Sequence, residues 1–505
     1  MISIPKLSKF DFLVLIVIVM IGLIHLPFPL GGDQSLFTLG ALEMQQGKVL
    51  YRDFWDLKQP GIYYFYFLAG SLFGFNEIGI HLFEFIYMML FSVILLLTLK
   101  SYFQHQVIAS LVPLLTVGVY YVVSNPSQLT QVEALIGFPL FLCLWLTYQS
   151  FKCEGKQRFF QLLSSGLIGG IILLFKLMFL LILLSFWGTL LVNFIFIKRQ
   201  SFQKAFVKIC LPIFLGVIFP ILVVISYFAW SNSLSIVYET FFVYPVQIVA
   251  NSKFSIIKFL RATRWFLQGF FPLIFMAIVA VYVSLRKSNN LLTWLLVIWC
   301  ISGMGVICLQ RHSLWDYHYL LLFVPVGILA TKGLDILWQP LKDLISPIIA
   351  TLLLFLFFLP LFLQLQFKSV ALVQNNFALT EQTRFKYQSV FRKEYPSLHS
   401  EVDFLSKPGN LSGDIFIIGD PSLYYLSGRN QATSLNGWSV ELFVPQQWTE
   451  LLKELDSSKP AYIFIHNTYK SMIKEKSPKM LEFLEQKYRI EHQSNRGTWY
   501  ILNVS

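Results

Sequence analysis

Long uncharged apolar runs constrain this chain more than any other feature of its sequence. The first run extends from Phe12 to Leu30 without a single Asp, Glu, Lys or Arg, and similar runs recur to about residue 365. A helix that crosses a bilayer needs about 20 predominantly apolar residues. Only 13% of all residues are charged, against about 25% in an ordinary soluble protein. The sequence therefore predicts a polytopic α-helical membrane protein.

We expect about eleven transmembrane helices, since that many runs reach the necessary length. They lie near 10–30, 77–99, 106–124, 131–151, 160–175, 177–197, 209–230, 265–285, 291–310, 318–337 and 344–365. Two regions leave alternatives open. Lys176 splits one long apolar run that a single bent helix would also explain, and residues 60–76 read as a partly inserted re-entrant helix.

The positive charge of the chain sets its expected orientation in the membrane. The formal net charge is +12, but the basic residues punctuate the apolar runs and form no patch, which argues against nucleic-acid binding. Lys and Arg accumulate in cytoplasmic loops. With a cytoplasmic N-terminus, fourteen of them fall in cytoplasmic segments and nine in outer segments. An odd number of spans then places the first loop, residues 31–76, and the tail, residues 366–505, on the outer side.

The N-terminus could also be read as a signal peptide, because Lys6 and Lys9 precede the first apolar run. The run is long, however, and no small-residue cleavage site follows it. We therefore expect an uncleaved first transmembrane helix. The five cysteines show no CxxC pair and no metal-ligand spacing, which favours packing roles for them.

The outer cations are unevenly distributed, and seven of the nine fall in two loops. The nine are Lys48, Arg52, Lys58, Lys176, Lys253, Lys258, Arg261, Arg264 and Arg311. Basic residues at a membrane surface attract anionic groups by about 1 kcal/mol each. A lipid-linked phosphate or pyrophosphate is one ligand that would explain them. Interfacial snorkelling and contact with lipid headgroups is the other explanation.

The first loop begins with a short predicted helix, residues 34–46, in which apolar residues recur at helical spacing. Asp33 stands where an N-cap residue would stand, which would give it a structural role. Gly47 fits a helix stop. Further on, Pro60 favours the start of a second helix, so that Lys58 lies just before free N–H groups and a positive dipole end. A lysine there is a poor partner for the helix dipole but a good phosphate ligand.

The first loop contains the pattern A-x-E-M-x-x-G-x-x-x-Y-x-D-(x)4-K-x-P-G-x-Y-Y, preceded by an aspartate. This pattern resembles the first outer loop of GT-C-type glycosyltransferases, the superfamily of protein O-mannosyltransferases and aminoarabinose transferases. The resemblance implies that Asp33 is the catalytic carboxylate and that Lys58 contacts the lipid phosphate of the donor. Gln59 replaces a proline that is usual in the family. Gln34 stands where many members have Glu, which leaves a divalent metal open.

Three further stretches resemble the same superfamily and occur in the expected order: TQVEALIGFPLFLCLWLTY, SGLIGGIILLFKLMFLLILL and QRHSLWDYHYLLLFVPVGILA. They contain Glu133, Lys176 and His318 respectively. Beside Lys58, the residues that we expect to bind substrate are Asp53, Asp56, Glu133, Lys176, Arg311, His318 and Tyr319.

Each of these residues also has a purely structural explanation. Glu133 suits the dipole at the start of a helix, and Lys176 suits a turn between two spans. The two loop aspartates suit pairing with neighbouring cations. His318 and Tyr319 suit the interfacial start of a helix.

The tail reads as a different kind of structure from the apolar body, residues 1–365. Residues 414–420, 461–467 and 496–503 have the pattern of buried strands, and 445–456 and 471–487 have helical spacing. We expect residues 366–505 to form a small extracytoplasmic α/β domain.

Together these features predict a glycosyltransferase in a bacterial inner membrane, among membrane lipids. It would transfer a sugar from a polyprenyl-phosphate-linked donor to a lipid, glycan or protein acceptor, with inversion at the anomeric carbon as the resemblance implies. No glycine loop for a nucleotide is visible, which agrees with a lipid-linked donor. A transporter or flippase of lipid-linked saccharides is the alternative, and a non-catalytic scaffold is a third reading.

Overall fold

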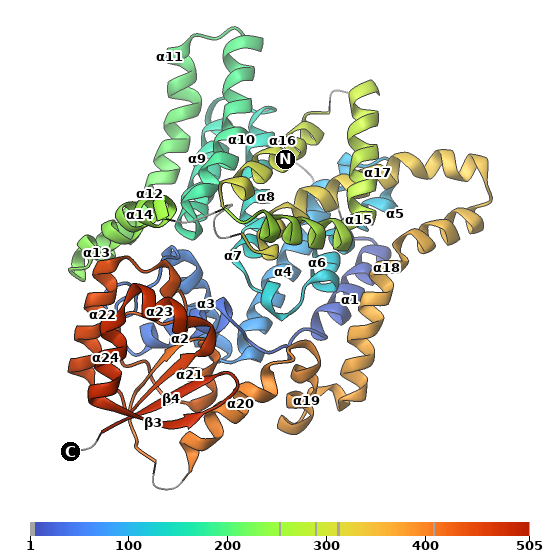
Figure 1. Ribbon diagram of the computed structural model, residues 1–505. Coiled ribbons are helices and arrows are strands. Elements are labelled where there is room, and N and C mark those ends of the chain that lie inside the picture. The colour runs from blue at the N-terminus through green and yellow to red at the C-terminus, as the bar shows by residue number, and fades with distance from the viewer. Residues whose placement is uncertain (1–5, 252–253, 288–289, 311–313, 408–409, 504–505) are drawn as a thin grey trace. The chain divides into compact units, whose positions relative to one another are not determined.

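The computed structural model describes residues 6–251, 254–287, 290–310, 314–407 and 410–503 (Figure 1). The chain forms two compact units, each assembled from three separate stretches. Unit 1 contains residues 1–27, 81–224 and 254–387. Unit 2 contains residues 28–80, 225–253 and 388–505.

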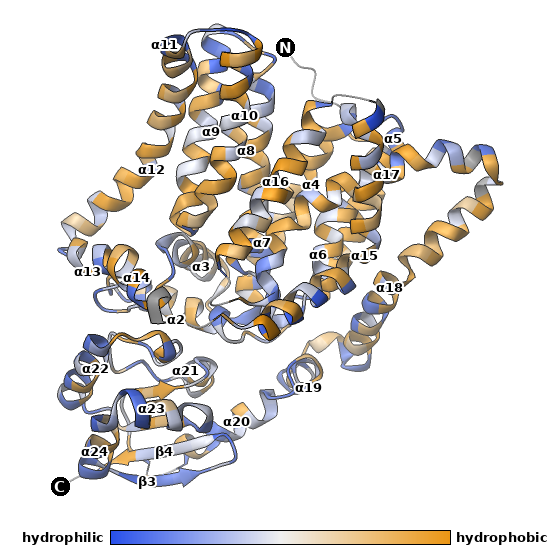
Figure 2. Ribbon diagram, turned by 45° about the horizontal axis from the view of Figure 1, so that its top comes forward, coloured by the Kyte–Doolittle hydropathy of each residue, from blue (hydrophilic) through white to orange (hydrophobic). Residues whose placement is uncertain are grey.

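Long apolar helices dominate the chain (Figure 2). They are α1 (Lys9–Leu23), α4 (Glu77–Leu99), α8 (Gly137–Ser150), α9 (Gly155–Phe175), α10 (Leu180–Val192), α12 (Leu211–Trp230), α15 (Ile256–Lys287), α16 (Leu291–Leu309), α17 (Phe323–Leu344) and α18 (Pro347–Gln374). Counted with the helical turns that extend them, nine helical segments in the described residues are long and apolar enough to cross a membrane. The chain is an integral membrane protein, as its composition predicts.

The count of eleven spans is not confirmed, because two of the predicted spans differ from the other nine. Helix α1 has 15 residues and is therefore about 22 Å long, less than the roughly 30 Å of a bilayer core. Residues 106–124 are broken into α5 (Gln106–Ala109), a π-helical turn (Leu114–Gly118) and α6 (Val119–Val123). Pro113 stands at the break between α5 and the π-helical turn.

Lys176 separates two helices, so the single bent helix is excluded. Its backbone is extended, with φ −166° and ψ 119°, between the end of α9 and the 3-10 turn that leads into α10. Both halves qualify separately as membrane spans. The interruption turns the Lys176 side chain away from helical register, which matters for the contacts described below.

In unit 2, the first loop folds into α2 (Asp33–Gln45) and α3 (Pro60–Phe73). The prediction that Asp33 caps α2 is wrong. Gly32 is the N-cap residue, with φ 53°, and it makes no side-chain cap bond, so Asp33 is the first helical residue. The left-handed backbone that only glycine adopts readily moves the helix start forward by one residue. Gly47, with φ 89°, follows the end of α2 as expected.

The tail in unit 2 forms a four-stranded sheet in the order β1-β2-β4-β3. Its strands are β1 (Ile415–Ile418), β2 (Tyr462–His466), β3 (Tyr488–Gln493) and β4 (Gly497–Leu502). β1 and β2 are parallel, whereas β4 runs antiparallel to both of its neighbours. The predicted strands correspond to β1, β2 and β4, and β3 is an additional edge strand.

Helices cover both faces of this sheet. On one face, α22 (Pro445–Ser458), α23 (Lys470–Lys476) and α24 (Pro478–Lys487) pack on alternate residues of β1 and β2. On the other face, α20 (Tyr395–Asp403) approaches Trp499, whose indole N–H donates to Glu401. The predicted helix 471–487 is divided at Ser477, just before a proline.

Trp55 of the first loop is part of the hydrophobic core of the tail. It is 1% exposed and lies in the cluster that includes Val440, Phe443 and Trp448. Tyr244, from α14 (Tyr244–Asn251), belongs to the same cluster. The core of unit 2 is therefore built from segments that are far apart in the sequence.

Candidate active site

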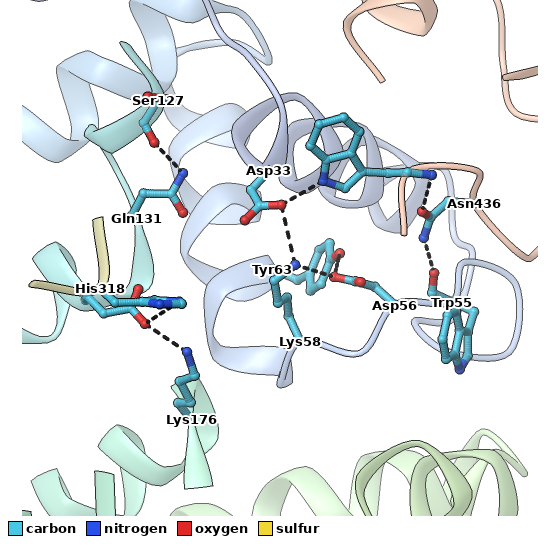
Figure 3. A network of polar contacts seen from close by, with 12 residues as sticks. Asp33, Trp55, Asp56, Lys58, Tyr63, Ser127, Gln131, Lys176, His318 and Asn436 are labelled. Atoms are coloured by element: carbon cyan, nitrogen blue, oxygen red, sulfur yellow. Dashed lines mark hydrogen bonds and ion pairs between the residues drawn. The ribbon is translucent and has the colours of Figure 1, made fainter. Parts of the chain in front are cut away.

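Unit 2 brings together three residues of the first loop that the sequence singles out. Lys58 Nζ lies 3.5 Å from Asp33 Oδ1 and 3.9 Å from Asp56 Oδ2 (Figure 3). Asp33 comes from the first turn of α2, and Lys58 comes two residues before α3 begins. Lys58 therefore precedes α3 in the chain, and its amine lies beside Asp33 in the first turn of α2. We call Asp33, Asp56 and Lys58 the loop cluster.

Asp56 is the most deeply buried member of the loop cluster, with a side chain 1% exposed. Its Oδ2 accepts a hydrogen bond of 2.7 Å from the Tyr63 hydroxyl, and its Oδ1 is buried without a hydrogen-bond partner among the described residues. The Lys58 side chain is 31% exposed. An accessible amine therefore lies near an inaccessible carboxylate of opposite charge.

Asp53, which we also expected to bind substrate, lies in a local network of its own. It forms an ion pair of 2.8 Å with Arg52 and accepts a hydrogen bond from the Val49 backbone N–H. Its pKa lies below the ordinary value chiefly because Arg52 donates hydrogen bonds to the carboxylate. These contacts agree with the structural explanation of this residue.

Trp438, from the tail, reaches the loop cluster and was not expected from the sequence. Its indole Nε1 donates a hydrogen bond of 2.8 Å to Asp33 Oδ1. Asn436, two residues earlier, donates to the backbone carbonyl of Trp55 at 2.5 Å (Figure 3). A contact across 405 residues leaves no periodic signal in a single sequence, and only the run of turn-forming residues around Gly437 marks the segment.

Unit 1 contains a second polar cluster, formed by Glu133, Lys176, Gln310 and His318. Lys176 Nζ lies 2.8 Å from Glu133 Oε1, and His318 Nε2 lies 3.7 Å from the same oxygen (Figure 3). Lys176 also donates to the side-chain carbonyl of Gln310. Glu133 is buried, whereas the Lys176 side chain is 22% exposed.

The extended backbone at Lys176 and the start of the Glu133 helix are what allow this second cluster to form. Three residues that the sequence singles out separately are therefore neighbours. Gln310, the residue before the undescribed segment 311–313, was missed because an isolated glutamine at the end of an apolar run carries no distinctive pattern.

The other two predicted substrate ligands have different outcomes. Tyr319 is 1% exposed. Its hydroxyl lies 2.6 Å from Thr263 Oγ1 and its ring stacks on Phe266, which gives it a packing role in unit 1. Arg311 lies outside the described residues. The roles predicted for Glu133, Lys176 and His318 stay predictions.

The sequence leaves a divalent metal open, and the described side chains bear on that point. In the described ranges, no group of three or more His, Cys, Asp or Glu side chains has the arrangement of a metal site. The loop cluster supplies two carboxylates with a lysine between them.

Comparison with known proteins shows which solved structures share this fold. Residues 58–227 match the family described as dolichyl-phosphate-mannose-protein mannosyltransferase. The crystal structure of ArnT from Cupriavidus metallidurans bound to undecaprenyl phosphate has a TM-score of 0.61, with 12% identity over 98% of each chain. The apo structure of that protein gives 0.59, with 13% identity over 97% of each chain. Among curated proteins, none matches the sequence at a significant level.

At such low identity the likeness to ArnT establishes architecture, and it extends over nearly the whole chain. The family match covers three of the four stretches that carry the sequence resemblance, in part or in full. This chain has the GT-C fold of polytopic membrane glycosyltransferases, the superfamily that its first loop resembles.

Proposed function

We propose that this protein is a membrane glycosyltransferase that moves a sugar from a polyprenyl-phosphate-linked donor to an acceptor on the extracytoplasmic side. The observation that carries the proposal is the loop cluster, where the accessible Lys58 amine lies 3.5 Å from the Asp33 carboxylate in the first turn of α2. The fold is shared with a protein solved with undecaprenyl phosphate. Lipid, glycan and protein acceptors all remain candidates.

Lys58 is the proposed ligand of the donor phosphate. Transfer of a glycosyl group from a phosphate breaks the bond between the anomeric carbon and the phosphate oxygen, so negative charge grows on the leaving group. A cation that is already in place stabilises that charge. The first turn of α2, which carries Asp33 beside this amine, adds the positive dipole end of a helix. An ammonium group and a helix N-terminus together favour an anionic phosphate.

Asp33 is the proposed general base. The acceptor hydroxyl loses its proton as it attacks the anomeric carbon in an oxocarbenium-like transition state. A carboxylate within hydrogen-bond reach can take that proton, for roughly 10²- to 10⁴-fold in rate. The Asp33 side chain is 13% exposed, in contrast to the enclosed Asp56. Asp33 is therefore the more accessible carboxylate of the pair.

The two roles are coupled through the amine of Lys58. In the structure, Lys58 contacts Asp33 through a long ion pair, and a cation at that distance lowers the proton affinity of the carboxylate. A donor phosphate competes for the same amine. When the phosphate takes the ammonium group, Asp33 becomes a stronger base at the moment when a sugar is present to react.

The second cluster, in unit 1, is proposed to bind polar groups of a substrate. Lys176 and His318 there share the Glu133 carboxylate. A hydroxyl or phosphate oxygen of a substrate can accept a hydrogen bond from Lys176, as the side-chain carbonyl of Gln310 does. This assignment follows from the contacts within unit 1 alone.

The test uses the full-length protein in nanodiscs with a panel of undecaprenyl-phosphate-linked pentoses and hexoses. Released undecaprenyl phosphate and sugar-modified envelope components are measured by mass spectrometry. We expect Asp33→Asn to abolish transfer while donor binding persists. We expect Lys58→Ala to weaken binding of undecaprenyl phosphate, measured by native mass spectrometry.

Matched surface controls come from the tail, where Asp456 and Lys487 form an exposed ion pair. Asp456→Asn and Lys487→Ala make the same chemical changes away from the loop cluster and should leave both readouts unchanged. Full transfer by Asp33→Asn would remove the base assignment. Unaltered phosphate affinity in Lys58→Ala would remove the phosphate assignment.

A further inference from the structure

We propose that Trp438 is a positioning residue for Asp33, so that a segment of the tail completes the catalytic centre in the first loop. This inference rests on the proposed function, in which Asp33 is the base. It goes further by assigning a role to a residue outside the stretches that resemble glycosyltransferases.

The geometry around Asp33 shows how the indole acts. Trp438 Nε1 and Lys58 Nζ both approach the Oδ1 atom of Asp33, at 2.8 and 3.5 Å. Two donors on one oxygen fix the rotation of the carboxylate about its side-chain bonds. The indole also lies against Gly32, the residue before Asp33, since a Cβ added to Gly32 would come within 3.1 Å of Trp438 Cζ2. The ring therefore restrains both the side chain and the turn that begins α2.

Trp438 is itself held by a rigid segment, Ser434–Trp438. At one end of the segment, the Trp55 backbone N–H donates to the Ser434 carbonyl at 2.8 Å, and Ser434 donates to Glu454 of α22. In the middle of the segment, the Trp438 backbone N–H donates a hydrogen bond of 3.0 Å to the side-chain oxygen of Asn436. Together with the Asn436 contact to the Trp55 carbonyl, these bonds tie the segment to the first loop.

Strand β1 and the residue that follows it pack directly against the backbone of the segment. A Cβ on Gly437 would lie 2.0 Å from the carbonyl oxygen of Ile417, and the Gly419 N–H donates to the Gly437 carbonyl. The backbone of the segment thus lies directly on the sheet, with no room for a side chain. This support holds the indole N–H at a fixed position relative to Asp33, as a positioning group requires.

The same contacts could serve stability alone, and the protonation behaviour of Asp33 separates the two roles. A hydrogen bond to a carboxylate favours its charged form. Removing the indole donor therefore shifts the acidic limb of the pH–rate profile to higher pH. Lys58, Asp56 and Tyr63 face Asp33 from the α3 side. Arg392, which lies against Gly31 and pairs with Asp420, is a further charge near this turn.

The experiment compares Trp438→Phe with the wild type in the full-length protein in nanodiscs. Phenylalanine keeps an aromatic ring over Gly32 and removes the N–H donor. Using the undecaprenyl-phosphate-linked sugar from the panel that is turned over, we expect kcat to fall about ten- to a hundred-fold, the range for one hydrogen bond to a charged group. The KM for the donor should stay within about twofold, because Lys58 binds the phosphate. The acidic limb should move to higher pH.

Trp448→Phe is the matched control. Trp448 is buried in the core of the same domain, and its Nε1 has no hydrogen-bond partner in the part of the chain that the structure describes. The substitution removes an indole N–H without removing a bond to the loop cluster. We expect normal kcat and a normal pH profile from it.

A comparison with Asp33→Asn keeps the two proposals distinguishable. If Asp33→Asn is inactive and Trp438→Phe retains wild-type kcat and pH profile, the positioning role is overturned and the base assignment stands. If Asp33→Asn retains full transfer, the base assignment is wrong, and the positioning role that rests on it is wrong as well. If Trp438→Phe lowers kcat but leaves the acidic limb of the pH–rate profile where the wild type has it, the indole acts independently of Asp33 and the inference is wrong.

Discussion

Lys176 and Glu133 form an ion pair of 2.8 Å in which the carboxylate is buried and the amine is partly exposed. Breaking a buried pair by removing one partner leaves an uncompensated charge, which costs about 3–5 kcal/mol. We expect Lys176→Met to lower the midpoint of thermal unfolding in detergent. The double variant Glu133→Gln/Lys176→Met should recover part of that loss, because the remaining amide carries no charge. An unchanged midpoint in Lys176→Met would show that the pair contributes nothing to the fold.

Trp55 should be essential for the integrity of unit 2. It is 1% exposed in the core of the tail and donates from Nε1 to Thr240 at 3.0 Å. Replacing a buried Trp with Ala costs about 3–5 kcal/mol. We expect Trp55→Ala to make both the first loop and the tail sensitive to limited proteolysis. Trp230→Ala is the control, because Trp230 is 83% exposed, and it should leave the digestion pattern unchanged.

Asp53 should contribute to stability in a pH-dependent way. Its pKa is lowered, chiefly by hydrogen bonds from Arg52, so its contribution is present above the ordinary aspartate pKa of about 4. The contribution is lost as the pH falls through the lowered pKa of the folded state. We expect the difference in unfolding midpoint between wild type and Asp53→Asn to be small at pH 7, since the pair is exposed. The difference should shrink as the pH falls below about 4, and a difference that grew on acidification would contradict this assignment.

An exposed apolar stripe runs along residues 234–246 and should contact lipid. Leu234, Tyr238, Phe242 and Val246 recur every four residues and are 41 to 68% exposed. The opposite side of these helical turns packs on the core of unit 2 through Ile236, Val243 and Ile248. A helix of this kind lies in a membrane interface.

The stripe can be tested with a spin label on a cysteine-free background. A label at Phe242→Cys should be relaxed more by oxygen, which dissolves in lipid, than by a water-soluble nickel complex. Lys474→Cys on α23 should show the reverse. A water-exposed label at position 242 would contradict the lipid contact.

The apolar pattern was enough to predict most helices, because a membrane-spanning helix forms all its backbone hydrogen bonds within one continuous apolar run. It was less reliable where proline interrupts a run, as at Pro113 before the π-helical turn. In the tail, the three apolar strands were predictable. β3 was missed because its pattern is mostly exposed, with only Tyr488 buried, so it lacks the apolar run that marks a buried strand.

The candidate site was predictable only in part. Asp33 and Lys58 stand in a recognisable pattern, and the structure brings them to 3.5 Å. The cap assigned to Asp33 was wrong because the positive φ of Gly32 cannot be read from the sequence. Trp438 could not be predicted, because a pairing between distant segments depends on how the tail folds onto the loop.

The discontinuous construction of unit 2 has a consequence for how the protein is made. Its central strand β4 spans Gly497–Leu502, and the sheet it completes supports Trp55, more than four hundred residues earlier. During synthesis, Trp55 in the first loop therefore lacks its packing partners in the tail until most of the chain has been translated and inserted. Such long-range closure is slow and leaves apolar surface open to misassembly. Cells producing this protein would need to shield that waiting intermediate, and slowing synthesis late in the message should increase its loss to proteolysis.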